Sequence, residues 1–174
     1  MFLQKSFMSP QIESTVTLIS PFPTESLNLV WNWLNQFPEN NFDDFGPKNF
    51  GEFESEMIRR MSVEKTWGVR KDGVLCGIIA FLPLNYHVGT FHGICMSKAV
   101  HGTGTAKRAV RTVVDEIFQS GVMKISASYF ATNSKVEHLL LSLGAQYEGT
   151  LLKQTVQNGQ PIDMRLVAFF RNDA

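Results

Sequence analysis

The segment HGTGTAK, residues 101–107, sets two glycines one residue apart in front of an amphipathic pattern. From Ala106 onward the apolar residues recur at the spacing of one helical face, and Gly121 ends the pattern. The short apolar run 94–96 in front of the loop favours a buried strand. A glycine turn between a strand and a helix directs free backbone N–H groups and the positive end of the helix dipole outward. The chemistry that these residues suggest is phosphate binding by the backbone.

Two common phosphate-binding loops do not fit this segment. A Walker A loop ends in Gly-Lys-Ser/Thr, whereas the segment lacks both the second glycine and the hydroxyl after Lys107. A dinucleotide-binding loop needs a third glycine where Lys107 stands, and an acidic residue at the end of the next strand, where KISASYFA has none. The glycines therefore serve a different phosphate ligand, or they form only a flexible turn before a helix.

The rest of the chain alternates strands and helices within one expected domain, residues 1–174. Strands are expected at 15–20, 66–70, 74–81, 88–96, 123–130, 146–156 and 162–170, and helices at 27–34, 50–61, 106–120 and 134–143. The polar segment 37–49, which contains Asn and Pro, is expected to be a loop. Asn158-Gly159 should form the turn between the last two strands. This order predicts an α/β protein.

The composition excludes several classes of partner. Sixteen Lys and Arg balance sixteen Asp and Glu, so no basic field attracts nucleic acid or an anionic membrane. The apolar runs are far shorter than the roughly 20 residues of a membrane span, and the segment MFLQKSFMSP is too short and polar for a signal peptide. We therefore expect a cytoplasmic protein without a metal site, in which Cys76 and Cys95 are buried, reduced thiols.

The glycine loop and the order of elements resemble the GNAT N-acetyltransferases. Gly102, Gly104 and Ala106 match the Gln/Arg-x-x-Gly-x-Gly/Ala loop that holds the pyrophosphate of acetyl-CoA in that family. The segment NSKVEHLLLSLGAQYEG, residues 133–149, is similar to the family's Asn-containing fourth helix. The closing hairpin, with Asp163 after the Asn-Gly turn, looks like the branch that acetylates ribosomal-protein N-termini and related amines.

Over residues 15–170 this resemblance implies a GNAT fold: a mixed, mostly antiparallel central sheet that splays between its fourth and fifth strands and is flanked by helices. It implies acetyl-CoA as cosubstrate and an enzyme that moves the acetyl group to a primary amine, on a protein N-terminus or a small molecule, by direct attack in a ternary complex. The acceptor is expected between the segment 24–62 and the hairpin 156–163, in a monomer or homodimer.

The resemblance also assigns the cofactor site. The pantetheine arm is expected in the splay of the sheet, and the diphosphate on the backbone of the glycine loop. The implied cofactor-binding residues are Ile94, Cys95, Met96, His101, Gly102, Thr103, Gly104, Thr105, Ala106, Lys107 and Asn133.

Several side chains that relatives use for acid–base chemistry are replaced in this sequence. Thr90 and Phe91 stand where the fourth strand often carries Glu, and the apolar Val136 and Leu140 stand where relatives place a Ser or Tyr acid. His101 replaces the usual Arg or Gln of the loop. Ser134, with Glu137 three residues later, is expected to cap the fourth helix.

His92 is the candidate catalytic base. A histidine has an unperturbed pKa of about 6.5, which suits removal of the proton from an attacking amine. Strict alternation along the strand would place His92 on the same face as Ile94 and Met96. Two functions stay open at this point: an active N-acetyltransferase, and a catalytically degenerate acyl-CoA-binding or interaction module on the same fold. The intact glycine loop and Asn133 fit both.

Overall fold

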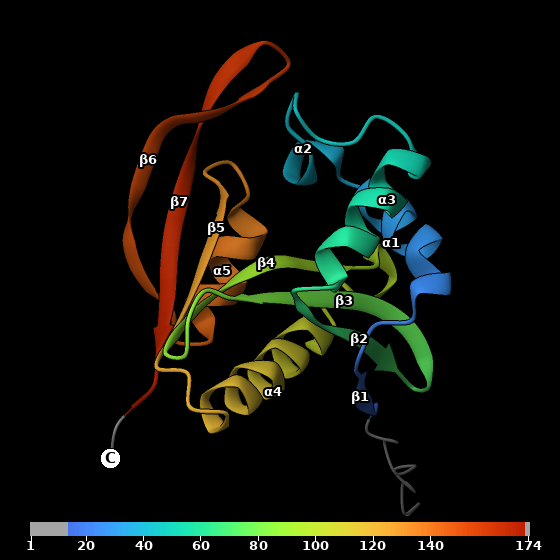
Figure 1. Ribbon diagram of the computed structural model, residues 1–174, viewed down its shortest axis with the longest axis vertical. Helices are drawn as coiled ribbons and strands as arrows, with labels where there is room; N and C mark the ends of the chain where they lie inside the picture. The colour runs from blue at the N-terminus through green and yellow to red at the C-terminus, as the bar shows by residue number, and fades with distance from the viewer. Residues whose placement is uncertain (1–13, 173–174) are drawn as a thin grey trace, which may run out of the picture.

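The computed structural model describes residues 14–172 and contains one mixed sheet flanked by helices (Figure 1). The strands are β1 (Val16–Ile19), β2 (Lys65–Lys71), β3 (Val74–Pro83), β4 (Val88–Met96), β5 (Lys124–Phe130), β6 (Gln146–Gln157) and β7 (Gln160–Phe170). The helices are α1 (Leu27–Leu34), α2 (Pro38–Asn41), α3 (Phe50–Met61), α4 (Thr105–Gln119) and α5 (Ser134–Ser142), with 3-10 turns at Thr24–Ser26 and Lys98–Val100. The mixed, mostly antiparallel sheet predicted from the sequence is confirmed.

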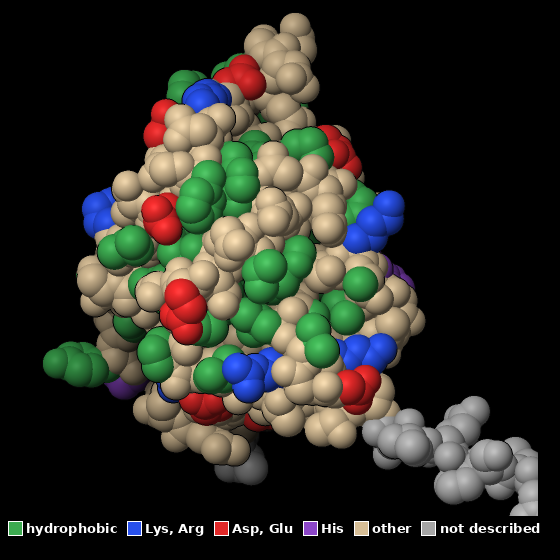
Figure 2. Space-filling model, turned by 90° about the vertical axis from the view of Figure 1, so that its right-hand side faces the viewer, with side chains coloured by type: hydrophobic (Ala, Val, Ile, Leu, Met, Phe, Trp, Pro, Cys, Tyr) green, Lys and Arg blue, Asp and Glu red, His purple; other side chains and the backbone are tan. Residues whose placement is uncertain are grey.

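Helices cover both faces of the sheet and build two apolar cores. The larger core packs α4 and α5 against the sheet, around side chains such as Val113, Ile125 and Leu140. The smaller core joins α1 and α3 to the opposite face through Ile78. Figure 2 views the side that carries α1 and α3, where apolar side chains are exposed between scattered charged ones.

The sheet has the strand order β1-β2-β3-β4-β5-β7-β6, and it separates in its middle. The parallel strands β4 and β5 pair only from Val88 opposite Lys124 to Phe91 opposite Ala127. Beyond that point β4 runs on to Met96 and β5 to Phe130 without pairing to each other. The predicted splay between the fourth and fifth strands is therefore present, and it leaves one edge of β4 without a neighbouring strand.

A β-bulge changes the direction of one side chain in β4. On β3, Ala80 pairs with Gly93 and Phe81 with Phe91, so His92 has no partner of its own. The extra residue breaks the alternation of side chains. Ile94 and Met96 pack with the core of α4, whereas His92 contacts Glu64, which follows α3. The expectation that His92 shares a face with Ile94 and Met96 is wrong for this reason.

The final hairpin forms as predicted, and the segment 37–49 does not. Asn158 and Gly159 both have positive φ, 52° and 72°, which a two-residue turn of this kind requires. In the segment expected to be a loop, Pro38–Asn41 forms the short helix α2, with Pro38 at its first position. The Asn41 side chain donates to the carbonyls of Leu34 and Phe37 and holds this turn against the end of α1.

We predict that Ile125→Ala destabilises the fold strongly. Ile125 lies in the middle of the larger core and is 0% exposed, so its truncation leaves a cavity there. The free energy of unfolding should fall by about 2–5 kcal/mol in urea titrations. Ile58→Ala is the matched control, because Ile58 is 53% exposed on α3, and it should change stability by less than about 0.5 kcal/mol. Equal effects of the two substitutions would contradict this placement of the core.

Candidate active site

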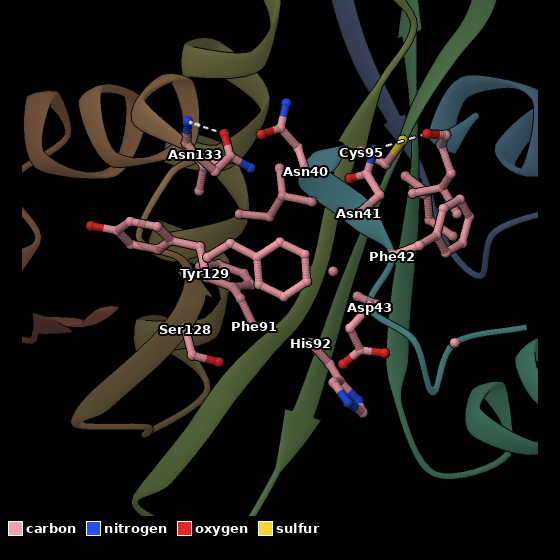
Figure 3. Close-up of a pocket in the computed structure, with 18 of the residues that line it drawn as sticks. Asn40, Asn41, Phe42, Asp43, Phe91, His92, Cys95, Ser128, Tyr129 and Asn133 are labelled. Atoms are coloured by element: carbon pink, nitrogen blue, oxygen red, sulfur yellow. Dashed lines mark hydrogen bonds between the residues drawn. The ribbon is translucent and has the colours of Figure 1, made fainter. Parts of the chain in front are cut away.

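Two cavities meet where β4 separates from β5. The first, of about 550 Å³, lies between α1, α3, the segment 40–47 and the splayed strands (Figure 3). The second, of about 820 Å³, lies between the end of α1, the glycine loop and α5. The residues that line both are Asn40, Asn41, Ile94, Cys95, Asn133 and Val136. A molecule can therefore extend from the glycine loop to the first cavity along the free edge of β4.

The glycine loop presents backbone donors to the second cavity. Gly102 and Gly104 have φ values of 73° and 77°, in the left-handed region that favours glycine, and Gly104 is the N-cap of α4. Within the described residues, the N–H groups of Gly102, Gly104 and the first three residues of α4 have no hydrogen-bond partner. Free N–H groups at the positive end of a fifteen-residue helix suit a diphosphate.

The structure brings most of the predicted cofactor-binding residues to this cavity. Those that line it are Ile94, Cys95, Met96, His101, Gly102, Gly104, Ala106, Lys107 and Asn133. Thr103 and Thr105 do not, because their hydroxyls bond to each other at 2.7 Å and Thr105 is fully buried. The loop thus uses these two side chains to hold its own shape. The Thr103 N–H also donates within the loop, to the carbonyl of Val100, so of these two residues only Thr105 keeps a free backbone N–H.

His101 is held by neighbouring groups at the mouth of the second cavity. Its ring stacks on Phe37, with centroids 5.2 Å apart, and its Nε2 lies 3.3 Å from the carbonyl oxygen of Met96. The ammonium groups of Lys98 and Lys135 lie 6.0 and 4.4 Å from the Phe37 ring. Phe37, in the connection after α1, therefore contacts both the glycine loop and α5. The two lysine side chains place positive charge near the glycine loop, where a phosphate could bind.

Asn133 caps α5, and Ser134 does not. The Asn133 Oδ1 accepts from the N–H of Val136, whereas Ser134 is already the first residue of the helix. The partner expected to complete the Ser134 capping box, Glu137, instead forms an ion pair with Arg165 on β7. The predicted capping role of Ser134 is therefore wrong. Asn133 itself is buried, and its Nδ2 has no partner among the described residues, so it can donate to a ligand where the cavities meet.

The free edge of β4 carries backbone donors of its own. The N–H of Ser97 donates to Cys76 on β3, and N–H groups along a strand point to alternate sides. The N–H groups of Ile94 and Met96 therefore point away from β3, toward the gap that β5 has left. Two parallel donors beside both cavities can bind an oxygen that becomes negative during a reaction.

His92 belongs to a buried charge network that the sequence did not reveal. Its Nδ1 lies 2.6 Å from Glu64 Oε1, and the Glu64 side chain is 1% exposed. Arg60 on α3 donates through Nε to the same carboxylate at 2.9 Å. Burial acts to raise the pKa of Glu64, but the hydrogen bonds and charges of Arg60 and His92 outweigh burial and lower it. Glu64 is therefore an ionised carboxylate at neutral pH.

The ionised Glu64 determines which nitrogen of His92 carries the proton. A carboxylate can only accept hydrogen bonds, so the Nδ1 beside it must be the protonated nitrogen. Neutral His92 then keeps the lone pair on Nε2, across the ring from Glu64, and His92 lines the first cavity together with Asp43 (Figure 3). This arrangement orients an imidazole as a proton acceptor.

Two other reactive side chains beside the cavities cannot take that role. Burial raises the pKa of the Cys95 thiol to about 12, so this free cysteine stays protonated and is a poor nucleophile. The Tyr129 hydroxyl is buried, has no hydrogen-bond partner within residues 14–172, and is directed away from His92 (Figure 3). Val136 and Leu140, where relatives were expected to place an acid, are apolar, and Leu140 is 1% exposed. Residues 14–172 also contain no group of His, Cys, Asp or Glu that could hold a metal ion.

Comparison with protein-family models finds a match over more than half of the chain. The model of the acetyltransferase (GNAT) family matches residues 27–145, which include β4, β5 and the glycine loop. The chain belongs to the acetyltransferase (GNAT) family. It is by that membership an acetyl-CoA-dependent N-acetyltransferase. No curated protein matches the chain significantly.

Solved acetyltransferase structures share the fold at low sequence identity. A spermidine N-acetyltransferase from Vibrio cholerae, solved in complex with CoA and spermine, is 21% identical, with a TM-score of 0.75 and coverage of 89% of this chain and 95% of that one. A probable acetyltransferase from Chromobacterium violaceum is 16% identical, with a TM-score of 0.75 and coverage of 89% and 82%. No helix of this acetyltransferase within residues 14–172 is long and apolar enough to cross a membrane.

We predict that Glu64 stabilises the acetyltransferase in a pH-dependent way. Because folding lowers the pKa of Glu64, its stabilisation is present above the ordinary value of 4.5 and is lost as the pH falls below it. Glu64→Gln should therefore reduce the free energy of unfolding by about 1–3 kcal/mol at pH 7, and the difference from wild type should shrink toward pH 3.

The control for this prediction is Glu56→Gln on α3, the helix that Glu64 follows. Glu56 pairs with Arg60 at only 3.9 Å and its side chain is 44% exposed, so its loss should cost less than about 1 kcal/mol. Denaturant titrations between pH 3 and 8 measure both variants. A cost of Glu64→Gln that does not change with pH would show that folding does not lower the pKa of Glu64.

Proposed function

We propose that this protein transfers the acetyl group of acetyl-CoA directly to a primary amine, with His92 as the catalytic base and Glu64 as its positioning residue. The observation that carries the proposal is the 2.6 Å contact of His92 with a buried, ionised Glu64 at the wall of the first cavity. The base stands at one end of that cavity, and the free edge of β4 with the second cavity lies beyond it.

The second cavity fits the cosubstrate. The unpartnered N–H groups of Gly102, Gly104 and the first three residues of α4 suit the diphosphate of acetyl-CoA, and Lys107 adds a cation at the same place. The gap between β4 and β5 suits a narrow extended arm, which would place its thioester beside Ile94 and Cys95, where the cavities meet. Asn133 can donate its free Nδ2 to a carbonyl of that arm.

His92 would supply the base that the reaction needs. An amine attacks only when its nitrogen lone pair is free, and a protonated amine must first lose a proton. The unprotonated Nε2 of His92 accepts that proton, and the positive charge that develops on the ring is stabilised by ionised Glu64 at Nδ1. The buried Glu64 is itself held by Arg60, so its position does not depend on the substrate.

The bond changes balance without a further reactant. The amine nitrogen forms a bond to the thioester carbon, and the carbonyl electron pair moves to oxygen, where the N–H groups of Ile94 and Met96 can stabilise the charge. The pair then returns, the carbon–sulfur bond breaks, and the thiolate takes, through water, the proton that His92 accepted from the amine, which restores the neutral base. Cys95 is unsuited to an acyl-enzyme intermediate because its pKa is about 12, and this favours direct attack.

We predict that acetyl-CoA raises the melting temperature of the protein, because a ligand that binds only the folded state stabilises it by mass action. Gly104→Val should abolish this shift. A side chain at Gly104 meets no atom within 4 Å, so the variant should fold, but it strains the loop and covers the N–H groups of α4.

Gly73→Val is a matched control for the strain. Gly73 has a φ of 83° and equally open surroundings, but it lies in the turn between β2 and β3. This variant should lose similar stability and keep the shift with acetyl-CoA. If Gly104→Val bound CoA as tightly as wild type in calorimetry, the loop assignment would be wrong.

We predict that His92→Gln lowers kcat by about 10² or more and removes the acidic limb of the pH–rate profile. Glu64→Gln should lower kcat by roughly 10-fold to 100-fold and displace the same limb, since it acts through the imidazole. The double variant should be little worse than His92→Gln alone, because the two residues act as one unit.

The assay follows release of the CoA thiol and the mass of the acetylated amine, with Asp115→Asn, an exposed position on α4, as control. An unchanged rate and pH profile in His92→Gln would leave positioning by the backbone as the mechanism. Binding of acetyl-CoA with no transfer to any amine would favour the other function, a degenerate acyl-CoA-binding module. The apolar Val136 and Leu140 on α5 are consistent with that function, because neither can donate a proton.

A further inference from the structure

A clasp of six hydrogen bonds joins the segment 39–44 to the tip of the β6–β7 hairpin, residues 155–159. These two parts lie side by side at the top of Figure 1, although more than a hundred residues separate them in the chain. The Asp44 N–H donates to the carbonyl of Val156 at 2.8 Å, and the Thr155 hydroxyl donates to Asp43 at 2.6 Å. The Gln157 amide donates to the carbonyls of Glu39 and Phe42.

Asp44 completes the clasp through the Asn-Gly turn. Its two carboxylate oxygens accept the N–H groups of Asn158 and Gly159, both at 2.8 Å. These backbone hydrogen bonds lower the pKa of Asp44, so the carboxylate is ionised at neutral pH and the clasp is closed there. Without Asp44 these two exposed N–H groups would bond to water, so the carboxylate joins the turn to the segment 39–44.

The clasp forms one wall of the first cavity. Phe42 and Asp43 belong to both the clasp and the cavity lining, and Asn40 and Asn41 line the cavity from the same segment. The clasp already uses the C=O of Val156 and the N–H groups of Asn158 and Gly159, so these groups are not free to pair with an extended peptide. An acceptor that continues as a polypeptide would need such free backbone groups or an open groove.

The charges of the cavity do not suit a polycation. Among the described residues, its lining contains two carboxylates, Asp43 and Glu56, and two basic side chains, Arg60 and His92. Asp43 already accepts from Thr155 and from the N–H of Phe45, and Glu56 lies 3.9 Å from Arg60. A polyamine with several ammonium groups would lose water around each one and gain few free carboxylates in return.

The remaining lining is largely apolar and aromatic. Phe42 and Phe45 come from the segment above the cavity, Phe53 from α3, and Phe130 from β5. A volume of about 550 Å³ suits a small molecule with one apolar body. We infer that the acceptor is a compact primary amine with an aromatic or similar apolar group, of the arylalkylamine class, and not a polyamine or a polypeptide N-terminus. This inference rests on the proposed function and names its substrate.

The test compares three acceptors at a fixed acetyl-CoA concentration: 2-phenylethylamine, spermidine and the peptide Ala-Ala-Ala. We expect kcat/KM for 2-phenylethylamine to exceed each of the others by at least about tenfold, the effect of burying one aromatic ring. A higher kcat/KM for spermidine or for the peptide overturns the inference and leaves acetyl transfer to amines in place. Absence of transfer to all three, with acetyl-CoA bound, overturns the proposed function and the inference together.

A clasp variant tests the role of the wall directly. Asp44→Ala removes the acceptor of both turn N–H groups and should raise KM for 2-phenylethylamine severalfold. The ratio of kcat/KM for 2-phenylethylamine to kcat/KM for the peptide should fall. Asp115→Ala removes an exposed carboxylate on α4 and is the matched control. It should leave KM for 2-phenylethylamine and the ratio of the two kcat/KM values unchanged. If Asp44→Ala keeps the wild-type order and ratios of the three acceptors, the clasp does not select the substrate and the inference fails.

Discussion

The separation of β4 from β5 after four paired residues is the constraint on which the site depends. A strand edge inside a protein needs partners for its N–H and C=O groups, and β4 loses them beyond Phe91 on the side that faces β5. The helices α4 and α5 pack against the sheet on one face, and β7 of the final hairpin pairs with the far edge of β5. Unsatisfied backbone groups are thereby held beside a cavity, ready for the carbonyl groups of a ligand.

A second requirement comes from the buried carboxylate of Glu64. An ionised group in such a position is costly unless it is paired, and here a guanidinium and an imidazole share it. Arg60 reaches it from the last turn of α3, and His92 reaches it from β4, where the bulge places it on the face opposite to Ile94 and Met96. The irregularity of β4 thus has a consequence for chemistry, because it leaves the His92 imidazole at the wall of the first cavity and not in the core beneath α4.

Local sequence chemistry predicted those parts of the fold whose cause is local. The two glycines before α4, the apolar spacing of that helix and the Asn158-Gly159 turn depend on neighbouring residues, and each formed as expected. The separation of β4 and β5 came from the family resemblance. Asn133 was placed at the cofactor site, but its role as helix cap was assigned to Ser134, because a capping box and a cap one residue earlier look alike in a single sequence.

The parts that sequence analysis missed depend on contacts between distant residues. Nothing near Glu64 in the sequence shows that it lies against His92, and the bulge that turns His92 arises from pairing with β3. An Arg four residues before a Glu was a visible sign of a pair, but it is also common on exposed helices. The clasp between Asp44 and the hairpin tip was likewise invisible, since an acidic loop is usually only solvated.

The short connection after α1 has a consequence for how the two cavities communicate. At one end of this segment Phe37 stacks on His101 of the glycine loop, and at the other Asp44 holds the tip of the hairpin. One stretch of chain therefore forms part of the boundary of both cavities. A ligand whose binding shifted either end would change the free energy of the other, and linkage requires the two affinities to change by the same factor. The two substrates of this protein share a wall, and for that reason they need not bind independently.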